Sequence, residues 1–168
     1  MWWNIFSDRP ENLIKHTVMK NIFEKDTTEE VISRIEKLSP ESQRQWGKMS
    51  VSQMLAHCNV TYEMVYDNKH PKPGAIKRFF IKAFAKALVV GDKPYKQNLP
   101  TAPVFLVSDD KDFETEKRRL IDYLRRTQEL GENYFDGKES LSFGRLNKQQ
   151  WNNMFYKHLD HHLRQFGV

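Results

Sequence analysis

The sequence predicts an all-α protein, namely a four-helix bundle with an additional connecting helix between the second and third main helices. Apolar residues recur at helical spacing in five separate segments of the chain. Several of these segments begin with a pattern that caps the N-terminus of a helix. No segment of any length alternates apolar and polar residues as a half-buried strand does. The 168 residues suffice for one domain with one core.

Residues 1–18 precede the first helical pattern and show no clean period. We therefore expect them to be an extension, poorly ordered or peripheral, in front of a single helical-bundle domain over residues 19–168. The first helix of that domain is predicted to start at Thr27, because Thr27 and Glu30 form a capping-box pattern. Apolar residues then continue at helical spacing to about Leu38.

The second main helix is predicted to start after Ser50, which forms a capping-box pattern with Gln53, and to continue to about Tyr66. His57 falls in the middle of this helix, at the border of its apolar face. Cys58 falls on the apolar stripe itself. A nucleophilic cysteine needs exposure and a lowered pKa, so we expect Cys58 to be a small buried hydrophobic residue instead.

The connecting helix lies in a basic part of the chain, residues 69–96, where eight basic residues accompany one acid. Residues 75–90 form a strongly amphipathic pattern, in which Arg78, Lys82 and Lys86 make a basic ridge opposite an apolar face. Apolar faces of this size usually serve the core, so we expect the aromatic residues to pack on the bundle and the lysines to face solvent. The alternative is that this basic helix binds a membrane surface or an acidic partner.

The third main helix follows a linker. Residues 98–107 contain two prolines and are predicted to be extended and to border a cleft. Acidic residues and a serine at 108–112 are N-cap candidates for a long helix that continues to about Leu130. Gly131 interrupts the helical pattern, so residues 132–143 are predicted to form a loop.

The last helix carries the most informative residues of the chain. It is predicted to start after Asn147, which forms a capping-box pattern with Gln150. His158 and His162 stand four residues apart, so their side chains lie on one face. A histidine on an apolar face is more often a satisfied core residue than a ligand, and such a pair also arises by chance. Two inward imidazoles nevertheless need partners, and His57 is the natural third group from a facing helix.

These three histidines, His57, His158 and His162, are the predicted metal ligands. Neutral imidazoles suit Zn²⁺, Ni²⁺ or Fe²⁺, and three of them leave a coordination position for water or substrate. An open site of this kind lowers the pKa of bound water or of a thiol. Asp160 and Gln165 are candidates for supporting the ligands from outside, and His161 points elsewhere on the helix.

Composition sets bounds on the partners. The net charge of +5 is mild, and the chain carries no nucleic-acid-binding motif, so we expect no nucleic-acid partner. No apolar run approaches the length that a bilayer span needs. One cysteine excludes an internal disulfide and fits a reducing compartment, and the first residues lack the basic start of a signal peptide. A cytoplasmic location is therefore the default expectation.

Two segments carry a resemblance to a known family: WGKMSVSQMLAHC at 46–58 and KHLDHHLRQFG at 157–167. Together they resemble the DinB-like (YfiT-like) superfamily of metal-binding four-helix bundles, most closely a bacterial branch with the C-terminal signature HLDHHLRQFG. The resemblance covers about residues 19–168. It implies a divalent metal ion on His57, His158 and His162, and frequent homodimers. Relatives include S-transferases and isomerases that use low-molecular-weight thiols, and proteins described as hydrolases; the resemblance implies no nucleic-acid binding.

The leading hypothesis is therefore a divalent-metal-dependent enzyme, S-transferase-like or hydrolase-like, that activates a thiol or water for reaction with a small-molecule substrate. The alternative is a non-catalytic bundle that a metal stabilises, or a module that binds a membrane or a partner through the basic helix 75–90.

Overall fold

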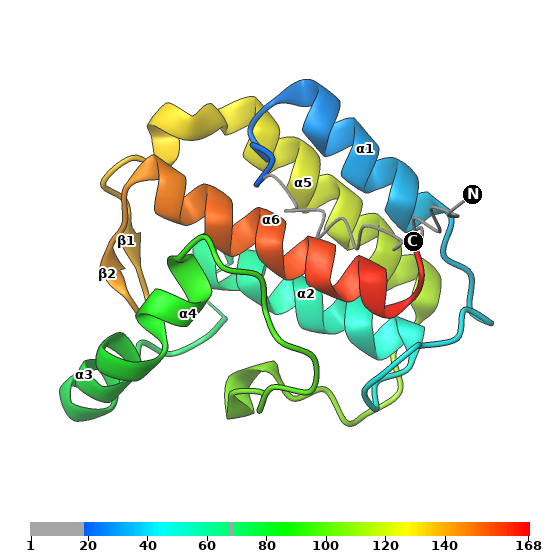
Figure 1. The fold of residues 1–168 in the computed structure, drawn as a ribbon, viewed down its shortest axis with the longest axis horizontal. Coiled ribbons are helices and arrows are strands. Elements are labelled where there is room, and N and C mark those ends of the chain that lie inside the picture. The colour runs from blue at the N-terminus through cyan, green and yellow to red at the C-terminus, as the bar shows by residue number, and fades with distance from the viewer. Residues whose placement is uncertain (1–18, 68) are drawn as a thin grey trace, which may run out of the picture.

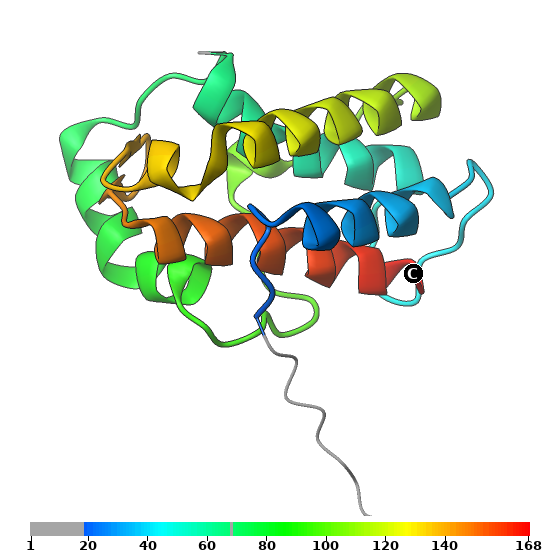
Figure 2. The same cartoon turned by 90° about the horizontal axis from the view of Figure 1, so that it is seen from above.

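A computed structural model describes residues 19–67 and 69–168 and shows a bundle of four main helices (Figure 1). They are α1 (Lys25–Glu36), α2 (Val51–Tyr66), α5 (Phe113–Phe135) and α6 (Lys148–Gln165), which run side by side (Figures 1 and 2). Both α1 and α2 contact α5 and α6. The predicted all-α bundle with a connecting helical segment is confirmed. The expected extension over residues 1–18 lies outside the described residues.

The core lies between the four main helices and is rich in aromatic residues. Its largest fully buried side chains are Trp151, Tyr62, Phe135, Phe155, Ile22, Ile35, Met54, Leu55, Leu120, Leu124, Leu146 and Leu159. The helix that carries two of the candidate ligands therefore also supplies much of the central packing, which holds its backbone in place.

The two helices that carry the histidines start where the sequence predicts. Ser50 accepts a hydrogen bond from the backbone N–H of Gln53, and the Gln53 side chain accepts one from the backbone N–H of Ser50. Asn147 and Gln150 form the same reciprocal pair at the start of α6. Both predicted capping boxes are present, and each satisfies backbone donors that a helix start leaves without partners.

The first helix begins earlier than predicted. It starts at Lys25, and Thr27 and Thr28 lie buried inside its first turn. The Asn21 side chain accepts a hydrogen bond from the backbone N–H of Phe23 and forms the turn that leads into the helix. Thr28 Oγ1 donates to the backbone carbonyl of Ile22 at 2.6 Å. The predicted capping box at Thr27 is therefore wrong, because Glu24 is the N-cap residue and Thr27 lies inside the helix.

The third main helix continues beyond its predicted end. α5 passes through Gly131, whose φ of 70° kinks it, and ends at Phe135. The last turn is held because Phe135 is fully buried and packs against Phe23, Trp151 and Phe155. The predicted loop after α5 contains a short antiparallel hairpin, β1 (Glu139–Ser140) with β2 (Gly144–Arg145).

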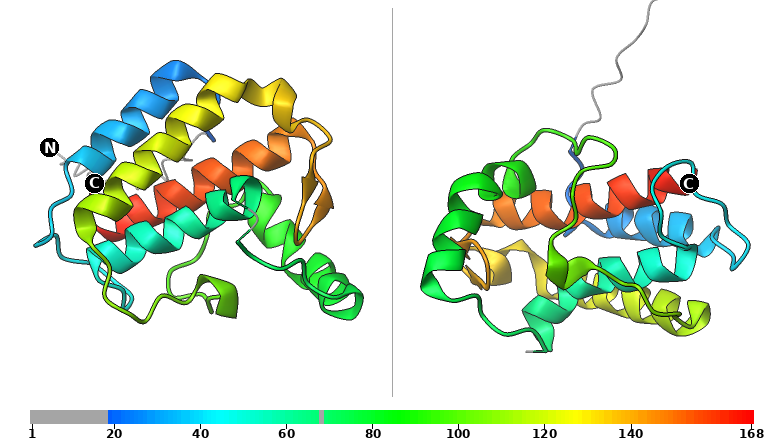
Figure 3. Two further views of the ribbon diagram at one scale, coloured as in Figure 1. Left: turned by 180° about the vertical axis from the view of Figure 1, so that it is seen from behind. Right: turned by 90° about the horizontal axis from the view of Figure 1, so that it is seen from below.

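The connecting segment forms two helices instead of one, α3 (Ala75–Phe84) and α4 (Lys86–Val90), and then a 3-10 turn, η1 (Pro103–Phe105). α4 packs on α6, whereas α3 projects from one end of the molecule (Figure 3). The expectation that the aromatic face packs on the bundle is wrong for α3. Its side chains at 76, 79, 80 and 84 are all exposed. The linker over 98–107 reaches α2 through η1.

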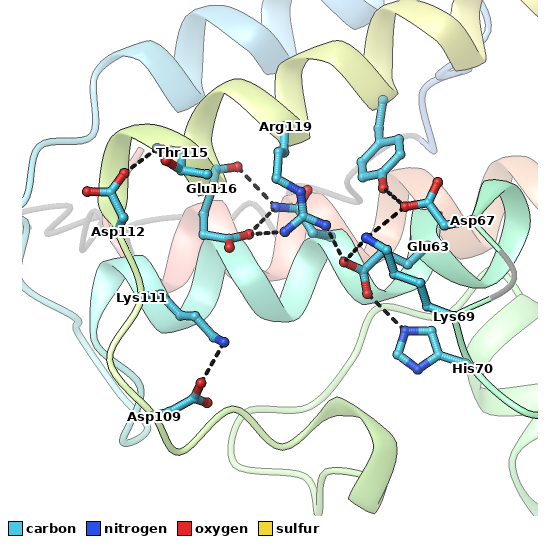
Figure 4. Close-up of polar contacts among 12 residues, drawn as sticks. Glu63, Asp67, Lys69, His70, Asp109, Lys111, Asp112, Thr115, Glu116 and Arg119 are labelled. Carbon is cyan, nitrogen blue, oxygen red and sulfur yellow. Dashed lines mark hydrogen bonds and ion pairs between the residues drawn. The ribbon is translucent and has the colours of Figure 1, made fainter.

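A network of charged side chains ties α2 to α5 (Figure 4). Glu63 of α2 pairs with Arg119 of α5 and lies 2.9 Å from the ring of His70. Arg119 also donates to Glu116 at 2.8 Å, and Glu116 accepts a hydrogen bond from Asn59 of α2 at 2.8 Å. Glu116 and Asn59 are buried, so the network fixes the register of α2 against α5 and with it the middle of α2.

Candidate metal centre

Three histidines meet where α2 and α6 face each other. His57 comes from the middle of α2, and His158 and His162 come from consecutive turns of α6. One ring nitrogen from each residue lies within 4.8 Å of the others. The ring centroids are separated by 4.5 to 4.9 Å. The structure thus brings together all three residues that the sequence analysis singled out, in a cluster that could hold a metal ion.

Each imidazole is held from outside by a partner of its Nδ1 atom. His57 Nδ1 donates to the backbone carbonyl of Phe105 at 2.9 Å, and His162 Nδ1 donates to the side-chain oxygen of Gln165 at 2.8 Å. His158 Nδ1 lies 3.1 Å from the hydroxyl of Thr61. Two of the three partners are obligate acceptors, which places the ring proton on Nδ1 and leaves Nε2 of His57 and of His162 free to bind a cation.

The contact between His57 and His158 is compatible with the site both with and without a cation, because the tautomer of His158 can change. Their Nε2 atoms are 2.9 Å apart, and His57 Nε2 carries a lone pair. Without a cation, the hydrogen bond requires a proton on His158 Nε2, and the Thr61 hydroxyl then donates to His158 Nδ1. With a cation, His158 takes the other tautomer and Thr61 accepts. The Thr61 hydroxyl serves both states because it can donate or accept.

The spacing of the nitrogens also fits a small divalent ion. Zinc–nitrogen bonds of about 2.0–2.1 Å in tetrahedral geometry separate the ligand nitrogens by about 3.3–3.4 Å. The observed 2.9 Å between His57 and His158 is a few tenths of an ångström shorter. An outward shift of the two rings by that amount would bring this pair of nitrogens to the tetrahedral spacing.

Burial keeps all three imidazoles neutral at physiological pH. It lowers the pKa of His162 to about 3, with a further contribution from His57. Burial also holds the pKa of His158 well below its usual range, and the neighbouring His162 and His57 act in the same direction. The pKa of His57 is lowered for the same first reason. Neutral imidazole is the form that binds metal, so the site needs no deprotonation before an ion enters.

The η1 turn covers the cluster on one side. The Phe105 ring lies 5.4 Å from the ring of His57 and 6.0 Å from that of His158. His57 and His162 are buried, whereas His158 keeps partial contact with solvent. Two surface hollows are lined by other parts of the chain, one around Leu130 and one around Pro94. Neither is lined by a histidine of the cluster.

Of the two residues expected to support the ligands, Asp160 and Gln165, the structure places Gln165 at the cluster, in contact with His162. Its side-chain nitrogen donates to the backbone carbonyl of Trp46 at 2.8 Å, which turns its oxygen toward His162. Gly47, at φ 80°, makes this approach possible, because a Cβ there would lie 2.4 Å from the Gln165 side-chain nitrogen. The loop before α2 thereby orients a ring on α6.

Other candidates from the sequence lie elsewhere. Asp160 pairs with Arg34 at 2.9 Å and with Arg164 at 3.0 Å, so its expected support of the ligands is not observed. His161 packs its ring against Trp46 and Tyr95 beside the cluster.

Cys58 is fully buried beside the sulfur of Met54, and burial raises its thiol pKa well above the usual range. That environment suits the small hydrophobic residue that the sequence predicts.

Sequence reasoning missed two partners of the histidines. Thr61 follows His57 by one helical turn, so the i, i+4 spacing on α2 was an available signal. The Phe105 partner is a backbone carbonyl, and no side-chain pattern reveals which carbonyl of a linker will face a histidine more than forty residues away.

The fold and the cluster together define a class: an all-α bundle with an inward three-histidine group that could hold a metal ion. A family model described as "Protein of unknown function (DUF1569)" matches residues 20–167. The chain belongs to this family. Searches of curated proteins and of solved structures found no significant match.

Proposed function

We propose that this protein is a divalent-metal-dependent enzyme whose ligands are His57, His158 and His162. The observation that carries the proposal is the orientation of the rings. Each Nδ1 is engaged by a partner outside the cluster, while the Nε2 atoms of His57 and His158 converge to 2.9 Å. This arrangement is typical of histidines that bind a metal and are oriented by surrounding hydrogen bonds.

The proposed ion is Zn²⁺, Ni²⁺ or Fe²⁺, all of which accept imidazole ligands. When bound at an open three-histidine site, such an ion lowers the pKa of a thiol or of water and supplies a nucleophile at neutral pH. Residues of this chain orient the ligands and shield the ion. Phe105 and Gln165 fix the rings of His57 and His162, and the Phe105 side chain limits the access of bulk water.

The substrate class is proposed from the resemblance of segments 46–58 and 157–167 to the DinB-like superfamily. This resemblance favours the transfer of a group to or from a low-molecular-weight thiol over hydrolysis. The other reactant would be a small molecule. A homodimer is also expected on that basis, and light scattering of the purified protein measures it directly.

The first test is elemental analysis of untagged protein after dialysis. We expect near-stoichiometric Zn, Ni or Fe in the wild type and in His161→Ala, a matched control that removes a neighbouring histidine of the same helix. The triple variant His57→Ala, His158→Ala, His162→Ala should lack the metal while circular dichroism shows it still helical. A wild type that stays metal-free after reconstitution would overturn the proposal.

A second candidate is a non-catalytic bundle that the metal stabilises. The observation that favours it is the cover over the cluster, since Phe105 packs on two of the three rings. An ion at this place would join α2 to α6 and raise the melting temperature. Metal-loaded protein that is stabilised yet turns over neither thiol-transfer nor ester and amide substrates would support this candidate against the enzyme.

A further inference from the structure

The apolar face of α3 points away from the rest of the molecule. At about 100° per residue, five apolar side chains of this helix share one side. They are Ile76, Phe79, Phe80, Ala83 and Phe84. The exposed fractions are 78% for Ile76, 67% for Phe79, 54% for Phe80 and 78% for Phe84. Contiguous exposed apolar side chains of this size mark an interaction surface.

The opposite side of α3 fixes this orientation. Arg78 donates to Glu139 of the hairpin at 2.6 Å, and Ile81 and Ala85 pack against the core. The Lys82 side chain lies over Gly144, where an added Cβ would meet its last two atoms at 3.1 Å. Turning the aromatic residues inward would break the Arg78–Glu139 pair and expose Ile81. In the structure the apolar face is therefore the outward one.

The positive charge of the protein is concentrated in the segment that contains α3, where Lys69, Lys72 and Arg78 pair with acids from outside the segment. Residues 69–96 contain eight Lys and Arg and one acid, which gives a formal charge of +7 with His70 neutral. The whole chain carries +5, so everything outside this segment amounts to −2. On α3 itself, Lys77 borders the apolar face on one side and Lys82 on the other, and both are exposed.

We propose that α3 is an attachment surface for a bilayer that contains anionic phospholipid. The helix lies along the membrane with the phenylalanine side chains at the headgroup–acyl boundary. Lys77 reaches the phosphates, and Lys82 reaches them once its side chain leaves Gly144. Ten residues extend about 15 Å, half of the hydrocarbon thickness, so the helix lies on the bilayer and does not cross it.

Two features favour a membrane over a protein partner. α3 projects beyond the four main helices (Figures 1 and 3), so a flat and deformable surface can meet it without a matching groove. The concentration of positive charge matches anionic lipid. This inference does not depend on the metal.

Cosedimentation with vesicles tests the proposal. The probes are vesicles of phosphatidylcholine alone and vesicles of equal parts phosphatidylcholine and phosphatidylglycerol, both at low salt. We expect binding to the anionic vesicles only. The double variant Phe79→Ser, Phe84→Ser should weaken it by about tenfold or more, because each phenylalanine contributes apolar burial. Lys77→Glu with Lys82→Glu should weaken it by a similar factor and reduce its salt dependence.

Matched controls use surfaces on the main helices. Leu130→Ser with Tyr134→Ser removes exposed apolar groups of α5, and Lys25→Glu with Lys37→Glu reverses exposed charges of α1. Both control variants should bind the anionic vesicles as the wild type does. Circular dichroism verifies the fold of every variant.

Three outcomes would overturn the proposal. The first is no binding to either vesicle. The second is binding that the α3 variants leave unchanged. The third is dimerisation in light scattering that Phe79→Ser, Phe84→Ser abolishes, without vesicle binding, which would assign the face to a second copy of the chain.

Discussion

Helices α6 and α3 depart from the usual distribution of polar and apolar residues in opposite directions. α6 buries polar side chains in the centre of the bundle, and α3 holds phenylalanines in solvent. The buried polar residues of α6 are Asn152, Asn153, Lys157, His162 and Gln165. Buried polar groups and exposed apolar patches are the informative exceptions to the burial rule, so these two helices are where function is best sought.

The two helices differ in whether neighbouring segments provide contacts for their unusual side chains. Asn152 accepts from the backbone N–H of Ile22, Asn153 donates to the carbonyl of Val90, and Lys157 donates to the carbonyl of Leu88. The segment before α1 and the C-terminal end of α4 thus provide backbone groups that the polar side chains of α6 satisfy. The apolar side of α3 is exposed, and α3 makes no extensive contact with a main helix in the described part of the chain. An amphipathic pattern therefore predicts a helix and its two faces, but the neighbours decide which face turns inward.

The sharpest way to test this contrast is to truncate one aromatic residue in each helix. Phe155→Ala in α6 should lower the free energy of unfolding by about 3–5 kcal/mol, because it leaves a cavity in a fully packed centre. Phe79→Ala in α3 should change it by less than about 0.5 kcal/mol. Urea unfolding of both variants measures the difference. Equal losses would mean that α3 packs in solution and would remove the contrast.

The partnered polar groups of α6 should be costly to remove. Asn152→Leu should lower the free energy of unfolding by about 1–3 kcal/mol, because the buried backbone N–H of Ile22 loses its acceptor at 2.7 Å. Asn133→Leu, at an exposed position of α5, is the control and should be near neutral. A stabilised Asn152→Leu protein would show that burial outweighs the hydrogen bond here.

The metal-free histidines should make stability depend on pH. Burial lowers the pKa of His162 from 6.5 to about 3, so the unfolded state binds more protons below pH 6.5. Stability is then level above about pH 7.5 and falls as the pH drops toward 3, by up to about 1.4 kcal/mol per pH unit for this group. His57 and His158 add in the same direction.

Urea unfolding of chelator-treated protein between pH 7.5 and pH 5 checks this dependence, in a range above most carboxyl titrations. The triple histidine-to-alanine variant should give a flatter profile. An equally steep profile in that variant would assign the effect to other groups.

The smallest expected effect concerns Thr61. Thr61→Val keeps the shape of the side chain but removes the hydroxyl at His158 Nδ1, and should weaken metal binding about tenfold. Competition with a chromogenic chelator measures the affinity. Thr127→Val, a buried threonine of α5, should leave the metal affinity unchanged. If both variants bind alike, the Thr61 contact has no role in orienting the ring.

Local patterns in the sequence were sufficient for the fold class and for the starts of α2 and α6. Ser50 and Asn147 cap their helices through residues three positions away, so the information is contained in four consecutive residues. His158 and His162 share a face for the same local reason. Only their meeting with His57 required an assumption about helix packing, and α2 and α6 do lie in contact.

Predictions failed where distant contacts override local preference. Thr27 is not an N-cap because the helix starts sooner, after a turn in which the backbone N–H of Ile22 donates to Asn152 of α6. α5 passes Gly131 because Phe135 gains an aromatic environment from Phe23, before α1, and from two residues of α6. The apolar face of α3 is directed outward, and Arg78 on its opposite side pairs with Glu139, more than sixty residues away. None of these contacts leaves a periodic trace in the sequence.

The distance along the chain between the histidines has a kinetic consequence. His57 and His158 are 101 residues apart, so their rings can meet only after α2 and α6 have docked. A metal ion at the cluster would then stabilise an interaction that forms late in folding. Its effect would fall on the unfolding rate and leave the folding rate nearly unchanged. Bound metal would thus lengthen the lifetime of the folded protein without helping it to fold.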